Sequence, residues 1–497
     1  MNLIMKLKSW AVIPAVLALI VPAYFAAENE TVTHSRYAVV DLGTLGGPNS
    51  SFQSSTKVVN ARRKAIISAD TAKPDPGNPC FNPVGTMSDC FLAHAAVWSL
   101  GKLKDLGTLP GGSFSQPLWI EDNGLIVGAS DIGIPDPLTG EVQTSAVLWQ
   151  NDGRMINLGT LGGNQSGGIA VNTQGQVIGA ALNTIPDVYS VAGIVGAFAA
   201  ATETRAFLWQ NGVMHDLGTL GGPDSFAQYI NESGQVAGFS YTNSTPDPNT
   251  GMPPIHPFLW QHGQMLDLGT FGGAFAVVDD LNNAGQVVGP MDLSGDQTFH
   301  PFLWDRGHLL DLGTLGGDNG EAFTVSDNGL VAGRADLPGG KVHHAFLWKN
   351  GHMQDLGVPA GLTCSTALSV NSRGQVVGDS GICGVGGHGF IWEKSGAPLD
   401  LTSLIPASSK IQVAGALYIT EDGTIAAIGN LPDGSSHAIL LIPSGQGGDW
   451  SRDEVPVTAL ATETAVPDDQ KNRSRPSIRE RVFGRTRTPA TPNDPRL

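Results

Sequence analysis

The stretch His344-Ala-Phe-Leu-Trp-Lys-Asn-Gly-His-Met-Gln-Asp-Leu-Gly357 recurs in altered form through most of the 497-residue chain. Self-similarity is sought before local structure because a fixed period of 20–50 residues is the signature of a repeat architecture. The last three steps between the Trp residues of the Phe-Leu-Trp motif are 44 residues each. This Trp falls at Trp98, Trp149, Trp209, Trp260, Trp304, Trp348 and Trp392.

Two further landmarks accompany the Trp, and together they predict four short strands per repeat. The strand 345–348 is apolar on both sides, so we expect it to lie between two neighbouring sheets. A turn of the form Asn-x-x-Gly joins the third and fourth strands, since Asn tolerates left-handed geometry and Gly supplies it. The Asp-Leu-Gly motif starts at Asp41, Asp105, Asn157, Asp216, Asp267, Asp311, Asp355 and, as Asp-Leu-Thr, Asp400. The turn starts at Asn60, Asp122, Asn172, Asn231, Asn282, Ser326, Asn371 and Thr420.

A four-stranded unit of about 40–45 residues is typical of a β-propeller blade. The chain enters the repeat at 36–43, which matches a second strand, and leaves it at 437–442, which matches a first strand. These ends are complementary. The sequence therefore predicts an all-β fold, a propeller of about eight four-stranded blades over residues 36–443. Three N-terminal strands plus the C-terminal strand are expected to close the ring. The alternatives are an open β-solenoid and a seven-bladed ring.

The compound motif also resembles a known family. His-Ala-Phe-Leu-Trp, then Gly-x-Met-x-Asp-Leu-Gly-Thr-Leu-Gly-Gly, then Asn-x-x-Gly-Gln-Val-Val-Gly is similar to the HAF-family probable extracellular repeat. The resemblance implies an exported repeat protein and supplies no catalytic residues. The chain departs from the pattern at 358–361 and 402–405, where other residues replace Thr-Leu-Gly-Gly. We expect altered turns there.

The two ends of the chain differ from the repeats. Residues 1–27 predict a signal peptide, because Lys6 and Lys8 precede an apolar run and small residues follow it. An uncleaved membrane anchor is the alternative, and residues 28–35 form a leader. Residues 444–497 are rich in Pro, Thr, Asp and Arg and are predicted to be disordered. The tail segment 471–497 carries a net charge of +6 while the whole chain carries −17. An acidic body makes nucleic acid an unexpected partner.

The four cysteines fit an oxidising compartment. We expect two local disulfides, Cys80–Cys90 and Cys364–Cys383, each stabilising by about 3 kcal/mol through loop closure. Free buried thiols are the alternative. No cysteine spacing fits a zinc site. Together with the signal peptide, this predicts a secreted, periplasmic or cell-surface protein.

Insertions occur at one place in the repeat, between the fourth strand and the next Trp. The gaps there are 30, 21, 30, 22, 15, 15 and 14 positions, so the long ones lie in the N-terminal half. Insertions in a repeat map to one face, often the binding face, and tolerated surface decoration is the alternative. The apolar segment 191–201 is expected to pack on the disc or to contact a partner. The candidate binding loops are marked by Asp75, Asp136, Asp187 and Asp247.

Repetition favours structural roles for the conspicuous side chains. The Asp of Asp-Leu-Gly is expected to hold a tight turn, with a Ca²⁺ ligand as the alternative and no other metal or cofactor expected. The Trp residues are expected in the core between blades, with carbohydrate platforms as the alternative. A recurring His is expected to have a structural or rim role. It occurs at His94, His256, His300, His344, His388 and His437.

Two functions remain open from the sequence. The first is a binding or scaffold module whose loop-bearing rim takes a glycan, a surface protein or another copy. The second is a polysaccharide hydrolase or lyase on a propeller scaffold. The sequence lacks Gly-x-Ser-x-Gly, His-Glu-x-x-His and a phosphate-binding loop. The insertions are poor in His and clustered acids, so we expect binding rather than catalysis, and catalytic residues are not assigned.

Overall fold

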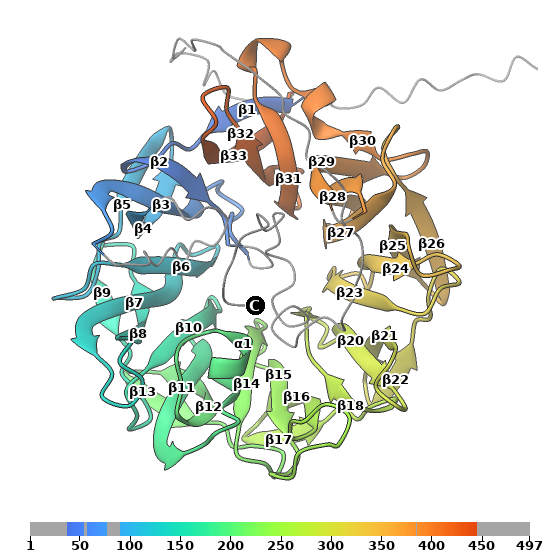
Figure 1. Ribbon diagram of the computed structural model, residues 1–497. Helices are drawn as coiled ribbons and strands as arrows, with labels where there is room; N and C mark the ends of the chain where they lie inside the picture. The colour runs from blue at the N-terminus through green and yellow to red at the C-terminus, as the bar shows by residue number, and fades with distance from the viewer. Residues whose placement is uncertain (1–36, 54–56, 77–89, 384, 445–497) are drawn as a thin grey trace, which may run out of the picture. The chain divides into compact units, whose positions relative to one another are not determined.

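The computed structural model describes residues 37–53, 57–76, 90–383 and 385–444, and these are built almost wholly from β-strands (Figure 1). The predicted signal peptide and leader, and the predicted tail beyond residue 444, lie outside them. Within the described residues no helix is long and apolar enough to span a membrane. The helical elements there are α1 (Val191–Val195) and the 3-10 turns η1 (Leu401–Leu404) and η2 (Ala407–Ser409). Turn η1 lies at the second of the two places, 402–405, where the chain departs from Thr-Leu-Gly-Gly.

The quoted stretch forms half of one four-stranded antiparallel sheet. Its strands are β23 (Gly320–Val325), β24 (Val331–Asp336), β25 (His343–Lys349) and β26 (His352–Gly357), paired in that order. Trp348 lies opposite Val331 on one neighbour and Met353 on the other. We call this sheet blade 6.

Seven further blades repeat this design. Blade 1 contains β2 (Gly46–Ser51), β3 (Ala65–Pro74), β4 (Phe91–Ser99) and β5 (Lys102–Asp105); blade 2 contains β6 (Ser115–Ile120), β7 (Ile126–Pro135), β8 (Val142–Trp149) and β9 (Met155–Asn157); blade 3 contains β10 (Ser166–Val171), β11 (Val177–Pro186), β12 (Thr202–Gln210) and β13 (Val213–Asp216); blade 4 contains β14 (Ser225–Ile230), β15 (Val236–Tyr241), β16 (Ile255–Gln261) and β17 (Gln264–Asp267). Blade 5 contains β18 (Gly272–Ala276), β19 (Asp280–Leu281), β20 (Val287–Leu293), β21 (Phe299–Asp305) and β22 (His308–Asp311); blade 7 contains β27 (Cys364–Val370), β28 (Gln375–Ile382), β29 (Val385–Glu393) and β30 (Leu399–Asp400); blade 8 contains β31 (Gln412–Ile419), β32 (Ile425–Asn430), β33 (Ser436–Pro443) and β1 (Tyr37–Asp41). One parallel pair, Ile255 with Phe275, joins blades 4 and 5 into a nine-stranded sheet.

Blade 8 joins the two ends of the array. Strand β1 pairs antiparallel with β33 from Tyr37 opposite Pro443 to Asp41 opposite Ile439 (Figure 1). The prediction that the ends complete one sheet is confirmed. The division of strands was predicted wrongly, because the N-terminus supplies one strand and the C-terminus three. The segment after Asp-Leu-Gly crosses to the next blade, so each blade starts at the third strand of the sequence repeat.

Each blade packs on the next, and the last packs on the first. Strand β28 of blade 7 contacts β31 of blade 8, and β33 of blade 8 contacts β2 of blade 1. The remaining neighbours meet in the same way, for example β20 with β23 and β24 with β27. The described strands therefore form a closed propeller of eight blades, and the solenoid and seven-bladed alternatives are wrong.

The core lies between the blades and contains the aromatic residues of the repeat. Phe207, Phe258, Phe302, Phe346 and Phe390 have no exposed surface. Trp98, Trp149, Trp304, Trp348 and Trp392 are buried, and Trp209 and Trp260 are half-buried. Trp348 packs with Phe346 against Val288 and Leu303 of blade 5. The Trp side chains thus occupy the blade-to-blade core, and none is an exposed platform.

Hydrogen bonds at one end of the strands join neighbouring blades. In five blades the turn between the first and second strands carries an Asn whose side-chain N–H donates to a backbone carbonyl of the next blade's turn. Glycine supplies the left-handed residue, as at Gly234 with φ 75°. The Asn is not left-handed, contrary to the expectation: the Asn231 carboxamide oxygen instead accepts from the N–H groups of Ser233 and Gln235. The inter-blade pairs are Asn60 with Glu121, Asn172 with Asn231, Asn231 with Asn282, Asn282 with Ser326, and Asn371 with Thr420. Arg63 of blade 1 pairs with Asp422 of blade 8 at 2.8 Å across the closure.

The disulfide Cys364–Cys383 is present, with the two Cα atoms 5.1 Å apart, so this predicted pair is confirmed. It ties the first residue of β27 to the connection between β28 and β29 in blade 7. Cys90 is also disulfide-bonded. Its predicted partner Cys80 lies outside the described residues.

Candidate binding surface

Where the structure describes them, the predicted insertions lie on one face of the propeller. They fall between the second and third strands of their blades, as in β7–β8, β11–β12 and β15–β16. Because successive strands are antiparallel, these connections leave from one end of the strands, and the first-to-second and third-to-fourth turns leave from the opposite end. We call the insertion side the loop face and the other side the turn face. Residues 77–89 of the blade 1 insertion lie outside the described residues.

The blade 2 insertion is a long hairpin whose tip is organised by Asp136. This side chain is 2% exposed, and its carboxylate accepts from the backbone N–H of Leu138 at 2.8 Å. The side-chain amides of Asn164 and Gln165 donate to the same carboxylate at 3.4 and 3.3 Å. Asp136 is therefore committed to holding the tip and is not available to a ligand.

The blade 4 insertion repeats this turn. The Asp247 carboxylate accepts from the N–H groups of Asn249 at 2.8 Å and Thr250 at 3.1 Å. In both tips the Asp carbonyl accepts from a Gly four residues on, Gly140 or Gly251, at 2.8 Å. The backbone N–H of Asp75 donates to the Cys90 carbonyl at 2.8 Å. In blades 2 and 4 the shared Pro-Asp-Pro sequence therefore forms a turn, and the Asp carboxylate stabilises it by accepting backbone hydrogen bonds.

The blade 3 insertion folds back on blade 4. Helix α1 buries Val191 and Ala192 against Phe226, Phe239 and Tyr241. The Tyr241 hydroxyl donates to the Tyr189 carbonyl at 2.9 Å. The apolar segment therefore packs on the disc, which is the first of the two alternatives predicted for it.

A buried carboxylate, Asp224, holds this insertion in place. It has no exposed surface and accepts from the backbone N–H groups of Val191 and, at 2.9 Å, Thr204. The pKa of Asp224 is raised to about 8, chiefly by burial and in part by the charge of nearby Asp187, against the opposing effect of those N–H donors. Asp187 itself accepts from the N–H of Tyr189 at 2.9 Å. Asp224 has the raised pKa of a general acid, yet no solvent reaches it, so its role is structural.

This carboxylate predicts a pH-dependent stability. A carboxyl whose pKa is raised in the folded state stabilises the fold at low pH, and that contribution is lost as the pH rises through about 8. The loss accumulates at about 1.4 kcal/mol per pH unit and ends near pH 8, where the carboxyl ionises in the folded state. We therefore expect the free energy of unfolding to fall by about 4 kcal/mol between pH 5 and pH 9. Urea unfolding at both pH values should show this loss shrinking in Asp224→Asn and persisting in Asp247→Asn. Equal pH dependence in wild type and Asp224→Asn would contradict the assignment.

The insertions of blades 2 to 5 are bonded into one continuous rim. The Gln165 side-chain N–H donates to Asp136 in the blade 2 tip and, at 2.7 Å, to the Ala199 carbonyl in the blade 3 insertion. Tyr241 links the blade 3 insertion to blade 4. The Asn249 amide donates to Asp296 of blade 5 at 3.0 Å. These hydrogen bonds hold the insertions in fixed positions relative to one another, so the loop face has a defined shape.

Exposed aliphatic side chains gather on the two hairpins of blades 2 and 3. Ile134, Leu138 and Val142 are 55, 61 and 46% exposed at the blade 2 tip, and Ile185 and Val188 are 53 and 90% exposed in blade 3. We call these five residues the aliphatic tips. Sequence reasoning missed them, because it selected the Asp residues of the same loops. Their signal was the pair of apolar residues that flanks Pro-Asp-Pro in blade 2 (Ile134 and Leu138) and Pro-Asp in blade 3 (Ile185 and Val188), which a strand-forming segment would also contain.

The recurrent His and Asp residues pair with each other in six of the eight blades. His344 Nδ1 lies 2.9 Å from the Asp355 carboxylate, which also accepts from the N–H of Gly357 at 2.7 Å. Arg205 pairs with Asp216 in blade 3, and blade 2 has Ser145 where Asn157 replaces the Asp. The other pairs are His94 with Asp105, His256 with Asp267, His300 with Asp311, His388 with Asp400, and His437 with Asp41. These contacts fasten the outer strand to its neighbour. Over the described ranges, no group of three or more His, Cys, Asp or Glu side chains is arranged to hold a metal ion.

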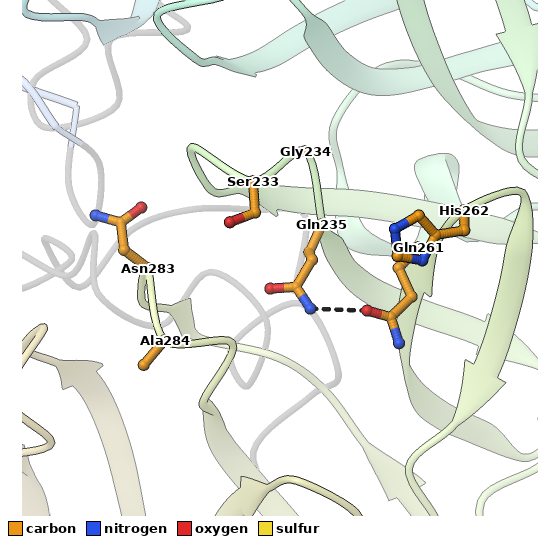
Figure 2. A pocket seen from close by; sticks show the side chains of 7 residues that line it. All are labelled: Ser233, Gly234, Gln235, Gln261, His262, Asn283 and Ala284. Carbon is orange, nitrogen blue, oxygen red and sulfur yellow. Dashed lines mark hydrogen bonds between the residues drawn. The ribbon is translucent and has the colours of Figure 1, made fainter.

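A small polar pocket lies on the turn face between blades 4 and 5 (Figure 2). Its volume is about 220 Å³, and a side-chain N–H of Gln235 donates to the Gln261 carboxamide oxygen at 2.9 Å at one side of it. On the other side, Asn283 accepts from the N–H of Glu232 and donates to Asp327 of blade 6. These polar groups join blades, which makes the pocket a poorer candidate than the loop face. Its lining residues are Ser233, Gly234, Gln235, Gln261, His262, Asn283 and Ala284.

Comparison with known proteins adds little to this picture. No family model matches the chain. No curated protein matches it either. Among solved structures it is similar to the β-propeller domain of the Trilobed protease from Pyrococcus furiosus, with 8% identity over 74% of this chain and 95% of that one and a TM-score of 0.38. It is similar to an oligogalacturonate lyase solved with manganese, with 11% identity over 83% and 94% and a TM-score of 0.41, and to the Aleuria aurantia lectin, with 9% identity over 84% and 98% and a TM-score of 0.21.

Proposed function

We propose that this protein is a binding module that uses its loop face to hold a protein partner. The observation that supports this is the rim of blades 2 to 5, where bonded insertions carry the aliphatic tips. Apolar side chains held in water at the ends of rigid hairpins gain about 25 cal/mol for each Å² that a partner covers. Grouped exposed apolar residues are typical of protein interaction sites.

A protein partner fits these residues better than a glycan. Sugar rings stack their C–H faces on aromatic side chains, whereas every large hydrophobic residue exposed in the described part of the chain is aliphatic. The Trp residues that were considered as carbohydrate platforms pack between blades. The Asp136 carboxylate of the blade 2 insertion and the Asp224 carboxylate that anchors the blade 3 insertion are buried and bonded, so they cannot act on a polysaccharide bound at the surface.

The same proposal places the protein outside the cytoplasm, in the secreted, periplasmic or cell-surface space. The Cys364–Cys383 disulfide supports this, because such bonds persist in oxidising compartments. The predicted signal peptide and the resemblance to the HAF-family extracellular repeat point the same way. A partner in that space is a protein of the cell envelope or of the medium.

The test is binding of the purified protein to intact cells of its source, with the aliphatic tips changed. We expect Leu138→Asp combined with Ile185→Asp to weaken cell binding at least about tenfold, because two charges must then be desolvated at the interface. Leu310→Asp is the matched control: Leu310 is 45% exposed on the outer strand β22, away from the insertions, and its change should leave binding intact.

Treatment of the cells separates the ligand classes. Binding that protease removes supports a protein partner, and binding that survives protease but is lost after periodate oxidation of glycans contradicts it. Self-association is read by sedimentation at rising concentration, and a dimer lost in the double variant would make another copy the partner instead. Release of reducing sugar that depends on a single carboxylate would replace binding by the hydrolase or lyase alternative.

A further inference from the structure

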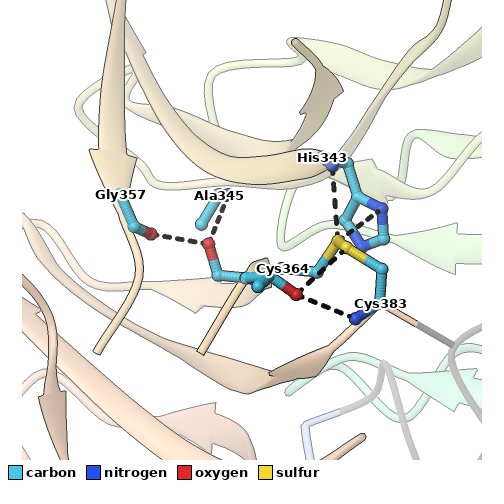
Figure 3. The surroundings of a disulfide bond; sticks show 7 residues. His343, Ala345, Gly357, Cys364 and Cys383 are labelled. Atoms are coloured by element: carbon cyan, nitrogen blue, oxygen red, sulfur yellow. Dashed lines mark hydrogen bonds between the residues drawn. A yellow bond between two sulfur atoms is a disulfide. The ribbon is translucent and has the colours of Figure 1, made fainter. Parts of the chain in front are cut away.

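The two sulfurs of the Cys364–Cys383 disulfide lie in unequal surroundings (Figure 3). Cys364 is 4% exposed at the start of β27. Cys383 is half-buried just after the end of β28, beside a part of the blade that lies at the loop face. A thiol arriving from solvent therefore reaches the sulfur of Cys383 more readily than that of Cys364.

The buried sulfur also has hydrogen-bond donors from the neighbouring blade. The backbone N–H of His343 donates to Cys364 Sγ at 3.4 Å, and His343 Nδ1 lies 3.6 Å from the same sulfur. The Cys383 backbone N–H donates to the Thr363 hydroxyl at 3.1 Å, and that oxygen lies 3.4 Å from Cys383 Sγ. A main-chain N–H and an imidazole thus converge on Cys364, which is the arrangement that stabilises a thiolate.

We propose that Cys364–Cys383 is a thiol-exchange site in which Cys383 is attacked and Cys364 is the leaving group. The thiolate of an external small thiol or protein dithiol attacks Cys383 Sγ and forms a new S–S bond to it. The Sγ–Sγ bond of the protein breaks, and its electron pair goes to Cys364. The resulting thiolate accepts hydrogen bonds from the His343 backbone N–H and from Nδ1 of the protonated ring. A second thiolate then attacks the external sulfur, which is released as the oxidised disulfide and leaves Cys383 reduced.

The accessibility of Cys383 and the stabilisation of the departing Cys364 thiolate both favour attack at Cys383. Exchange is faster when the attacked sulfur is accessible and when the departing thiolate is stabilised. Attack in the opposite sense would have to reach a buried sulfur and would expel Cys383, which has no imidazole beside it in the described contacts. His343 therefore acts as a positioning residue for the departing charge and does not itself form a bond to the thiol.

Other charged groups lie near His343 and bear on its protonation. Asp336 is its cross-strand neighbour on β24. Arg334 lies two residues earlier on that strand and interacts with Asp336 and with Asp379 on β28. The adjacent His344 is paired with Asp355 on the outer strand and has no described contact with a sulfur, so it serves as the control histidine.

The experiment treats the oxidised full-length protein with glutathione, quenches with N-ethylmaleimide at intervals and maps adducts by mass spectrometry. We expect glutathione on Cys383 and maleimide on Cys364 in the first intermediate. At pH 7, His343→Gln should slow the reaction about tenfold, the effect of one charge-assisted hydrogen bond, and His344→Gln should leave the rate unchanged. The difference should narrow at pH 9, where an imidazole ordinarily carries no second proton.

Three results would overturn the proposal. One is a first adduct on Cys364. Another is an equal rate in His343→Gln and wild type while both retain the same melting temperature. The third is a reduction rate that matches the unfolding rate measured under the same conditions, because the site would then react only after the blade opens. The disulfide of Cys90 in the same molecule is the internal reference, and its rate of reaction should be the same in wild type and in His343→Gln.

Discussion

The free energy of unfolding should be about 4–8 kcal/mol lower for a chain that begins at Gly43 than for one that begins at Tyr37. The shorter chain lacks β1, which buries Tyr37 to 2% exposure, together with Leu42, which is 3% exposed, and the half-buried Val39 and Val40. Each fully buried apolar side chain stabilises by about 1.5–3 kcal/mol. The comparison is urea unfolding of the two truncated chains, which differ only in the residues that complete blade 8.

The missing strand can be supplied from outside as a control. An added peptide spanning residues 37–43 should restore stability in proportion to its concentration, since it binds the folded state by strand addition to β33. Without it, the free edge of β33 should make the shorter chain associate. Two truncated chains that unfold within about 1 kcal/mol of each other would show that β1 does not close the ring.

The sequence predicted the number of blades and the pairing of the ends, because the repeat marks each strand. It misplaced the blade boundary for a physical reason. Each repeat contains two tight turns, which are hairpins, and two longer connections, of which one stays within the sheet and one crosses to the next blade. The connection between β24 and β25 stays within its sheet, and the segment after Asp355 crosses. Apolar periodicity is the same in both cases, so it cannot decide between them.

The pairing of His with Asp could have been found from the sequence. The two residues are separated by 11 positions in most blades, and they change together: Arg205 keeps Asp216, whereas Ser145 accompanies Asn157. Joint replacement at a constant spacing indicates contact across adjacent strands. The blade 3 insertion offers no such signal. Its anchor Asp224 occurs once, and its partner Val191 is 33 residues away, so periodicity cannot reveal the contact.

The Trp of the Phe-Leu-Trp motif should be the most costly single side chain to remove. Trp304 is 8% exposed and packs with Phe302 and Met291 at the junction of blades 4 and 5. Trp304→Ala should lower the free energy of unfolding by about 3–5 kcal/mol, through lost transfer energy and the cavity left behind. Trp260 holds the equivalent position in blade 4 but is half-buried, so Trp260→Ala should cost clearly less. Trp304→Phe should recover part of the loss, because the ring refills some of the cavity. Urea unfolding of the three variants gives the order, and a loss under about 1 kcal/mol in Trp304→Ala would mean that this side chain does not support the blade junction. Its burial would then be a consequence of the ring rather than a cause of it.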